Sequence, residues 1–191
     1  MTTRITSLIR TSTTNLLRLA LLSSLVTPAL FAADTAATKH SGHPQVSPST
    51  LVQLVRDGTA KYIDVNAATA AGYGPFLGCV AGTDHGAKGV HYVNGTLLAD
   101  LTLNPAQPQA LIYEPTDGKM TLVGVEFILD SASWLAKYGA PPVLDGQVFN
   151  FVGYPNRFNA NSFFELHVWA WRDNPQGSFV DWNNAVTCDG Q

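Results

Sequence analysis

The sequence predicts an α+β domain in which N-terminal helices pack on a curved, mostly antiparallel sheet of four to five strands, with one short helix inserted. Helical spacing of apolar residues fills the segment before residue 73, and strand-like segments follow from residue 88. Turn signals rich in Gly, Pro, Asn and Asp separate these segments. The 191 residues show neither an internal repeat nor a second domain.

Two helices are expected first. The segment SPSTLVQLVRDG, residues 47–58, offers Ser47 as a cap and Pro48 for the first turn, and its leucines and Val55 recur at helical spacing. The segment TAKYIDVNAATAAGYG, residues 59–74, carries an alanine-rich stripe that allows close approach to a sheet, and Gly72 sits where a C-terminal cap belongs.

Residues 72–89, GYGPFLGCVAGTDHGAKG, contain six glycines, which invites comparison with a phosphate-binding loop. The spacing GxxxxGK[ST] is absent, and so is GxGxxG after a strand. We therefore expect a long irregular loop, pinned at Cys79, with some glycines at positive φ.

The strands are expected over residues 88–94, 109–115, 119–129, 146–153 and 162–171. Asp117-Gly118 between the second and third of them indicates a hairpin turn. Residues 131–139, SASWLAKYG, form the inserted helix, which Gly139 ends. This helix-then-strand order is similar in layout to the cone of nuclear transport factor 2-like folds, an analogy that says nothing of chemistry.

Residues 1–32 have the layout of a secretory signal peptide. Three arginines and no acidic residue precede or flank a short apolar run from Leu19 to Phe31, and small residues follow it. Cleavage after Ala32 would leave a flexible N-terminal arm, residues 33–46, and a single α+β domain, residues 47–191. We expect a secreted or periplasmic protein; an uncleaved anchor helix is the alternative.

The charge balance bears on possible partners. The chain has 11 basic and 14 acidic residues, and because three of the arginines lie in the signal peptide, the mature protein has a formal net charge of −6. An acidic protein without a basic cluster is a poor candidate for binding nucleic acid or an anionic membrane. We expect neither partner, nor stable membrane insertion of the mature protein.

The two cysteines, Cys79 and Cys188, form an even pair in a protein expected to be exported, which predicts one disulfide. Such a bridge would tie the C-terminal tail to the glycine-rich segment. Two free thiols, or two metal ligands without CxxC spacing, are the alternatives.

Three residues that could bind a metal ion lie within predicted strands: His91, Glu126 and His167. The interior of a strand is a costly place for such side chains unless they face water, a partner or a site. Two histidines and one carboxylate are a common ligand set for a divalent transition metal. The alternative is a half-buried polar cluster in which these residues hydrogen-bond one another or tyrosine hydroxyls.

The segment FELHVWAW, residues 164–171, alternates in character. Glu165, His167, Trp169 and Trp171 would share one face, and Leu166, Val168 and Ala170 the other. The first face, with aromatic residues of neighbouring strands, suggests a small-ligand pocket whose binding residues would be Tyr92, Tyr113, Glu165, Trp169 and Trp171. The alternative is that these rings are ordinary core.

Five blocks of the sequence, KYIDVNAATAAGY, GVHYVN, ALIYEP, LVGVEFI and FELHVWAWRDNPQGSFVDWN, resemble a family of exported bacterial proteins that is uncharacterised. The resemblance covers about Lys61 to Cys188. It implies export and a single domain, and it brings no activity, cofactor or catalytic residue.

These observations favour an exported module that binds a small ligand or a metal ion of unknown identity. A metal-assisted or acid–base enzyme that uses the same strand residues is one alternative. A structural or interaction domain of the cell envelope, without a pocket, is the other. The oligomeric state does not follow from the sequence.

Overall fold

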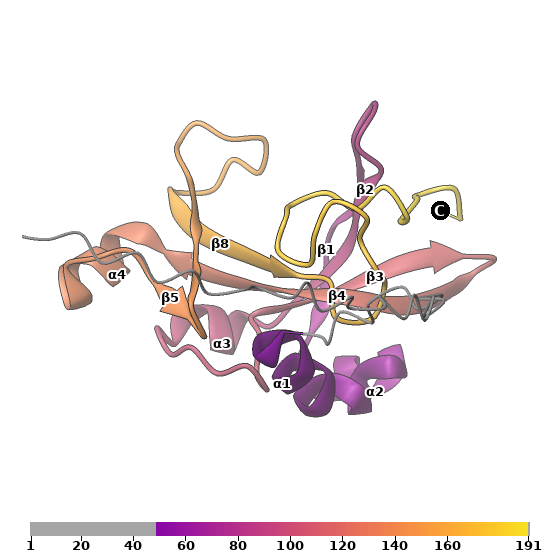
Figure 1. The fold of residues 1–191 in the computed structure, drawn as a ribbon, viewed down its shortest axis with the longest axis horizontal. Helices are drawn as coiled ribbons and strands as arrows, with labels where there is room; N and C mark the ends of the chain where they lie inside the picture. The colour runs from indigo at the N-terminus through magenta and orange to yellow at the C-terminus, as the bar shows by residue number, and fades with distance from the viewer. Residues whose placement is uncertain (1–48, 191) are drawn as a thin grey trace, which may run out of the picture. The chain divides into compact units, whose positions relative to one another are not determined.

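The computed structural model describes residues 49–190. The predicted signal peptide and N-terminal arm, residues 1–32 and 33–46, lie outside these residues and stay predictions. The described part has an α+β fold built on a curled antiparallel sheet of six strands in the order β1-β2-β3-β4-β8-β7 (Figure 1). The predicted fold class is therefore confirmed, and the strand count is higher than expected.

The helices are short. They are α1 (Thr50–Thr59), the 3₁₀ turn η1 (Ala60–Ile63), α2 (Val65–Ala70), α3 (Gly95–Ala99) and α4 (Ser131–Tyr138). Ser49 caps α1, and Asp64 caps α2 by accepting from the Asn66 amide. Because Asp64 begins a new helix, the predicted second helix is broken there. Within the described residues, no helix is long and apolar enough to cross a membrane.

The main sheet contains β1 (Gly74–Ala81), β2 (Ala87–Val93), β3 (Ala110–Thr116), β4 (Lys119–Asp130), β7 (Asn150–Val152) and β8 (Phe163–Val168). A separate hairpin pairs β5 (Val143–Leu144) with β6 (Gln147–Val148). The turn between β3 and β4 places Asp117 and Gly118 at positive φ, as the predicted hairpin requires. The inserted helix α4 also lies where the sequence predicts it.

The prediction of an irregular loop over residues 72–89 is wrong, because this segment forms β1 and the start of β2. The two strands pair out of regular register, with shifts between Phe76 and Cys79 and between Val80 and Ala81. Leu77 and Gly78 take positive φ at the first shift. A bulge adds a residue to one strand and so interrupts the two-residue alternation of side chains. For that reason the sequence does not show these strands by their alternation.

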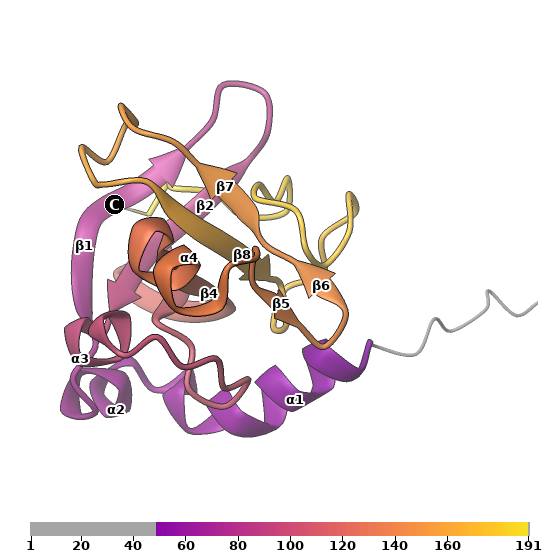
Figure 2. The same cartoon turned by 90° about the vertical axis from the view of Figure 1, so that its left-hand side faces the viewer.

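One face of the sheet carries the main apolar core. Val125, Phe127 and Leu129 of β4 pack with Leu166 and Val168 of β8, and all five are buried. Apolar residues of α1, η1, α2 and α4 complete this core, and α1, α2 and α3 lie along one side of the curled sheet (Figure 2). The helix α3 is absent from the sequence prediction, and three of its residues line the cavity on the other face of the sheet. The helices therefore do not all pack on one face, contrary to the sequence prediction.

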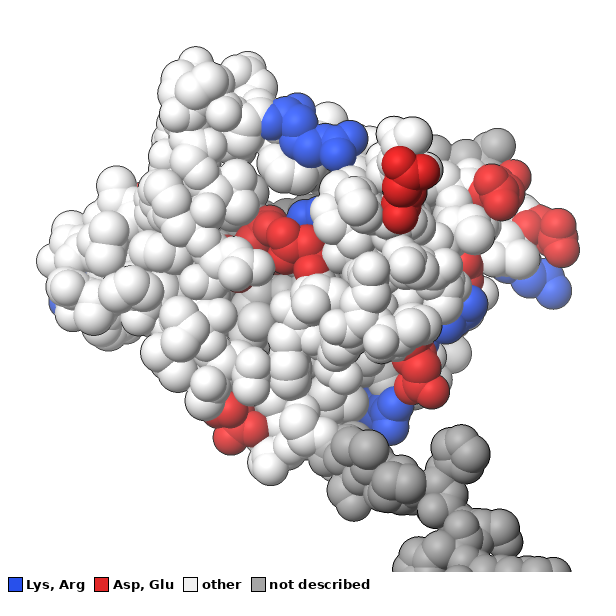
Figure 3. All heavy atoms as spheres, turned by 45° about the horizontal axis from the view of Figure 1, so that its top comes forward, with Lys and Arg blue, Asp and Glu red and all other residues white. Residues whose placement is uncertain are grey.

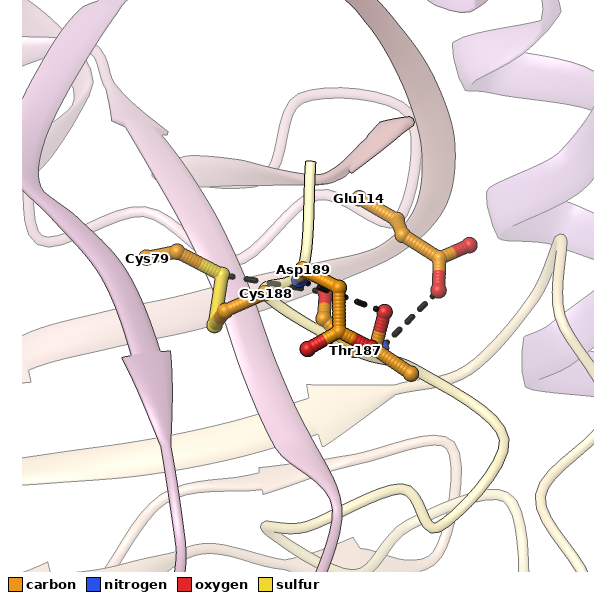
Figure 4. Close-up of a disulfide and its surroundings, with 5 residues drawn as sticks. All are labelled: Cys79, Glu114, Thr187, Cys188 and Asp189. Atoms are coloured by element: carbon orange, nitrogen blue, oxygen red, sulfur yellow. Dashed lines mark hydrogen bonds between the residues drawn. A yellow bond between two sulfur atoms is a disulfide. The ribbon is translucent and has the colours of Figure 1, made fainter. Parts of the chain in front are cut away.

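The C-terminal tail covers part of the opposite face. The disulfide predicted from the cysteine pair is present, and it joins Cys79 of β1 to Cys188 of the tail (Figure 4). Nearby, Glu114 accepts hydrogen bonds from the Thr187 amide, at 2.9 Å, and from the Arg172 guanidinium. These contacts hold the tail against β3, so a second small core forms beneath it around Trp169 and Val186.

The same substitution at two valines should cost very different amounts of stability. Val168 is fully buried against the helices, so Val168→Asp buries an unpaired carboxylate and should lower the free energy of unfolding by several kcal/mol. The control is Val148→Asp, because Val148 is 63% exposed and a change there should cost less than about 0.5 kcal/mol. Thermal or urea unfolding of both variants measures the difference. Equal stability of the two would mean that the faces of β8 are misassigned.

Candidate functional site

The strand register brings three ionisable side chains together on the face away from the main core. Glu126 of β4 pairs with His167 of β8 on one side and with Ala110 of β3 on the other. His91 stands on β2, one strand further along. His91 pairs with Ile112 of β3, and its imidazole reaches across that strand to Glu126.

The distances fit a single centre. His91 Nε2 lies 3.2 Å from Glu126 Oε2, and His167 Nε2 lies 3.9 Å from Glu126 Oε1. The two imidazole rings meet edge to face with centroids 5.8 Å apart. One ligand atom from each of the three residues lies within 4.8 Å of the others, and all three residues are buried. This is the set that the sequence predicts.

The side chain of His167 makes no hydrogen bond within the described part of the chain. The residue is fully buried, and among the described residues neither of its ring nitrogens has a hydrogen-bond partner. The ring instead stacks on Trp169, with centroids 6.0 Å apart. Buried polar atoms are rarely left in this state, since each costs about 1–3 kcal/mol. The arrangement therefore calls for a further group between His167 and its acidic neighbours.

A second group of charges surrounds the other nitrogen of His167. Nδ1 lies 3.6 Å from Asp181 Oδ1, and Glu165, His167 and Asp181 also bring their ligand atoms within 4.8 Å of one another. The Lys88 ammonium lies between the two carboxylates, 3.4 Å from Glu165 and 3.8 Å from Asp181. Asp181 is the most exposed member of the cluster, its side chain 31% accessible.

Carboxyl groups outnumber lysines in the buried cluster, the name used below for Lys88, His91, Glu126, Glu165, His167 and Asp181. Three carboxyl groups face one lysine and two imidazoles. In Figure 3, acidic side chains and part of a basic one occupy the bottom of a hollow whose surroundings are largely uncharged. Such a site favours a cation.

The protonation states follow from burial and from mutual charge. Burial lowers the pKa of His167 to about 4, so the imidazole is neutral at pH 7. Burial and the charge of Glu126 raise the pKa of Glu165 to about 9, although Lys88 opposes this. Burial alone would also raise the pKa of Glu126, but His167 and His91 outweigh it and hold that pKa well below its usual range. At neutral pH, Glu126 is thus ionised and Glu165 holds a proton.

A cavity of about 400 Å³ opens onto the buried cluster. Its floor is formed by Lys88, His91 and Glu126, and its walls come from β1, α3, β4 and the loop that follows β7. Most of the wall residues are apolar, among them Phe76, Val80, Leu98, Ile128, Phe158 and Phe163. Apolar walls with a few convergent polar groups are typical of small-ligand sites.

The structure separates the pocket residues that the sequence groups together. Glu165 joins the buried cluster, and Trp169 stacks on His167 while its indole N–H donates to the Val180 carbonyl at 2.6 Å. Tyr92 and Tyr113 lie on the opposite face of the sheet, where their rings pack together at 5.0 Å.

Trp171 also faces away from the cavity. Its indole N–H donates to Thr59 Oγ1 of α1 at 3.1 Å. The strand β8 ends at Val168, and the chain turns there, because the Ala170 amide donates to the Val168 carbonyl. Two-residue alternation therefore stops before Trp171, and this residue and the two tyrosines do not line the predicted face.

Two members of the buried cluster escape the sequence prediction. Lys88 falls where the expected loop, residues 72–89, overlaps the expected strand, residues 88–94, and Asp181 lies in the tail, 14 residues after His167. The only local sign of the position of Lys88 is the glycine that follows it. Gly89 takes a positive φ, which brings its backbone against Tyr113 and changes the direction of the chain at Lys88. Asp181 reaches the cluster only because the tail folds back over the sheet.

Comparison with protein-family models, with curated proteins and with solved structures gave no match. The resemblance to a family of exported bacterial proteins thus stays a prediction, and the site must be interpreted from its own chemistry.

The pKa of Glu165 predicts how stability depends on pH in metal-free protein. Because this pKa is about 9 in the folded state and about 4.5 in the unfolded state, the folded state alone holds the proton between these values. Stability should therefore fall as the pH rises from 7 to 9, by up to about 1.4 kcal/mol per pH unit. His167, with its lowered pKa, acts oppositely and only as the pH falls from about 6.5 to about 4.

The variant Glu165→Gln tests this dependence, since a glutamine keeps the hydrogen-bond donor and does not titrate. Lys88, Glu126, His167 and Asp181 all remain in place around it. Urea unfolding at several pH values, in the presence of chelator, should show the alkaline decline in the parent protein and a flat profile in the variant. A decline of the same size in both would assign it to another group.

Proposed function

We propose that this protein binds one divalent transition-metal ion through His91, Glu126 and His167, and that the cavity above holds a small ligand. The observation that carries the proposal is the buried imidazole of His167, whose ring nitrogens lack hydrogen-bond partners among the described residues. A metal ion bound at Nε2 would remove that cost.

The ligand chemistry supports a transition metal. Two imidazoles and one carboxylate suit zinc, iron or manganese, whereas calcium and magnesium prefer sites made of oxygen atoms alone. Metal binding requires neutral histidine and ionised carboxylate. The lowered pKa values of His167 and Glu126 supply both states at neutral pH.

The second acidic group supports a stoichiometry of one ion. Glu165 and Asp181 already have a cation between them, because the Lys88 ammonium lies within 4 Å of a carboxylate oxygen of each. A second metal ion there would have to displace a buried lysine. Three protein ligands at the first position leave coordination sites for water or for a ligand in the cavity.

A metal-assisted enzyme is the second candidate, and one observation favours it. Glu165 stays protonated at neutral pH beside the proposed metal ligands, as a general acid must. An envelope domain without a pocket, the third possibility, has less support because of the cavity.

Export is part of the proposal. Its support is the apolar segment of residues 19–31 behind three arginines, together with a disulfide in the folded domain.

Mass spectrometry of the protein from its native host tests export. We expect a mature chain that begins at or near Ala33, since the apolar segment and its small C-terminal residues match a signal peptidase site. A secreted or periplasmic fraction would contain it. A chain that still begins at Met1 or Thr2 would contradict cleavage.

Metal analysis of the purified protein tests the site. The variants His91→Ala, Glu126→Gln and His167→Ala should each weaken zinc binding by more than about 100-fold, because loss of a supporting residue alone costs about 10- to 100-fold. Titration calorimetry on chelator-treated protein should give one ion per chain for the parent. His40 and His43, in the predicted N-terminal arm, are changed to alanine throughout so that they do not bind the ion.

The matched control is His85→Ala. His85 is an exposed histidine outside the buried cluster, so its removal should leave zinc affinity unchanged. Thermal melts establish that every variant is folded. Folded parent protein that binds no zinc, iron or manganese would overturn the proposal, and equal losses in His85→Ala and His167→Ala would place the metal elsewhere.

A further inference from the structure

We propose that the natural ligand of the cavity is a small amphiphile with an anionic oxygen head, such as a carboxylate, and a single apolar chain or ring system. The head would bind at the metal and beside Lys88, and the apolar part would fill the cavity. This inference rests on the proposed metal site and adds the chemical class of the ligand.

The cavity is polar at one end. Lys88, His91 and Glu126 gather at its floor, and β4 leads away from them past Ile128 to Asp130. Four residues of strand separate Glu126 from Asp130, a distance of about 13 Å. Asp130 is already engaged, because it caps α4 by accepting from the Ser133 amide at 2.8 Å. The polar groups of this cavity are therefore concentrated at its floor, and the other polar side chain of its lining is Asn161.

The walls call for an apolar body. Phe76 and Leu77 of the edge strand β1 are 48% and 58% exposed, although both line the cavity. Phe158, from the loop after β7, lines it as well. A peptide or sugar laid along these walls would lose hydrogen bonds to water without replacing them. A hydrocarbon body would bury apolar surface on both sides.

The polar floor selects the head. Three protein ligands would leave an open coordination position on a metal ion bound by His91, Glu126 and His167. Lys88 lines the same cavity, so its ammonium would lie near a group bound at that position. An anionic oxygen can bind the metal and accept from this ammonium, whereas a cationic head would be repelled by both. Without the metal ion, the Lys88 ammonium stays between Glu165 and Asp181 and the Glu126 carboxylate faces the cavity, which favours an ammonium group over an anion.

The size of the cavity limits the ligand. A volume of about 400 Å³ is at the small end of ligand pockets, so a medium-chain fatty acid or an aromatic acid fits its scale better than a membrane lipid does. This limit sets the probe, octanoate, which carries one carboxylate and one short chain.

Calorimetric titration with octanoate tests the inference, with the chelator-treated and the zinc-loaded full-length mature protein compared. We expect octanoate to bind the zinc-loaded protein at least about tenfold more tightly than the metal-free protein. Octylammonium should show the reverse order, and octanol should bind weakly and without dependence on zinc. The zinc titration is run first, so metal binding is known independently.

Two tryptophan variants on one helix locate the ligand. Ala99 lines the cavity and is exposed at the surface of α3, so Ala99→Trp should fill the cavity and weaken octanoate binding at least about tenfold. Thr96→Trp, on the same helix and also exposed, does not line the cavity and should have no effect. Neither variant should change zinc affinity.

The outcomes separate the two proposals. Zinc binding without octanoate binding overturns the ligand class and leaves the metal site standing. Octanoate binding that is equal with and without zinc, or stronger binding of octylammonium to the zinc-loaded protein, overturns the role of charge. Failure to bind either zinc or octanoate overturns both proposals.

Discussion

Glu126 holds a negative charge at the centre of the sheet, and the rest of the polar face is arranged around that charge. A buried carboxylate is costly unless charges and hydrogen bonds compensate it. His91 provides one contact at 3.2 Å, and the protonated Glu165 hydrogen-bonds to it as well. His167 contributes an imidazole without a hydrogen bond of its own among the described residues. The strand β4 thus serves two environments, since its alternate residues enter the apolar core beneath the helices.

The C-terminal tail makes this polar face complete. The Trp169 amide donates to the Ser178 carbonyl, and the Trp169 indole donates to the Val180 carbonyl, so the tail is fixed over the stacked pair of Trp169 and His167. The same segment carries Asp181 into the buried cluster. A bridge between Asn183 and Ala87, and the disulfide to Cys79, keep it there. Closing a loop of 109 residues stabilises the fold by about 4–5 kcal/mol on chain-entropy grounds.

The alternation in β8 is the part of the site that the sequence shows most directly, because a regular strand of six residues must place His167 and Val168 on opposite faces. The cysteine pair and the helix α4 are equally local signals. Alternation within a strand does not say which of its faces meets which neighbouring strand. For that reason the sequence prediction places Tyr92 and Tyr113 on the wrong face of the sheet. The position of Lys88 depends on the irregular pairing of β2 with the edge strand β1, and that of Asp181 depends on a folded tail. Both are set by tertiary contacts rather than by local pattern.

The two faces of the sheet differ in a way that packing alone does not explain. The face beneath the helices is closed with ordinary apolar side chains, whereas the other buries a lysine, two histidines and three glutamates. Well-packed apolar residues often give equal or greater stability than buried ion pairs of similar volume. A structural role would therefore be met at lower cost by repeating the apolar pattern. Where local rules for stability are broken and a cavity adjoins the break, a binding function is the simplest physical reason. In this domain the cavity lined by the half-exposed Phe76 and Leu77 also reaches Glu126, which lies 3.9 Å from His167. The ring nitrogens of His167 have no hydrogen-bond partner among the described residues, so a cation and an apolar ligand together would satisfy what the protein alone leaves unsatisfied.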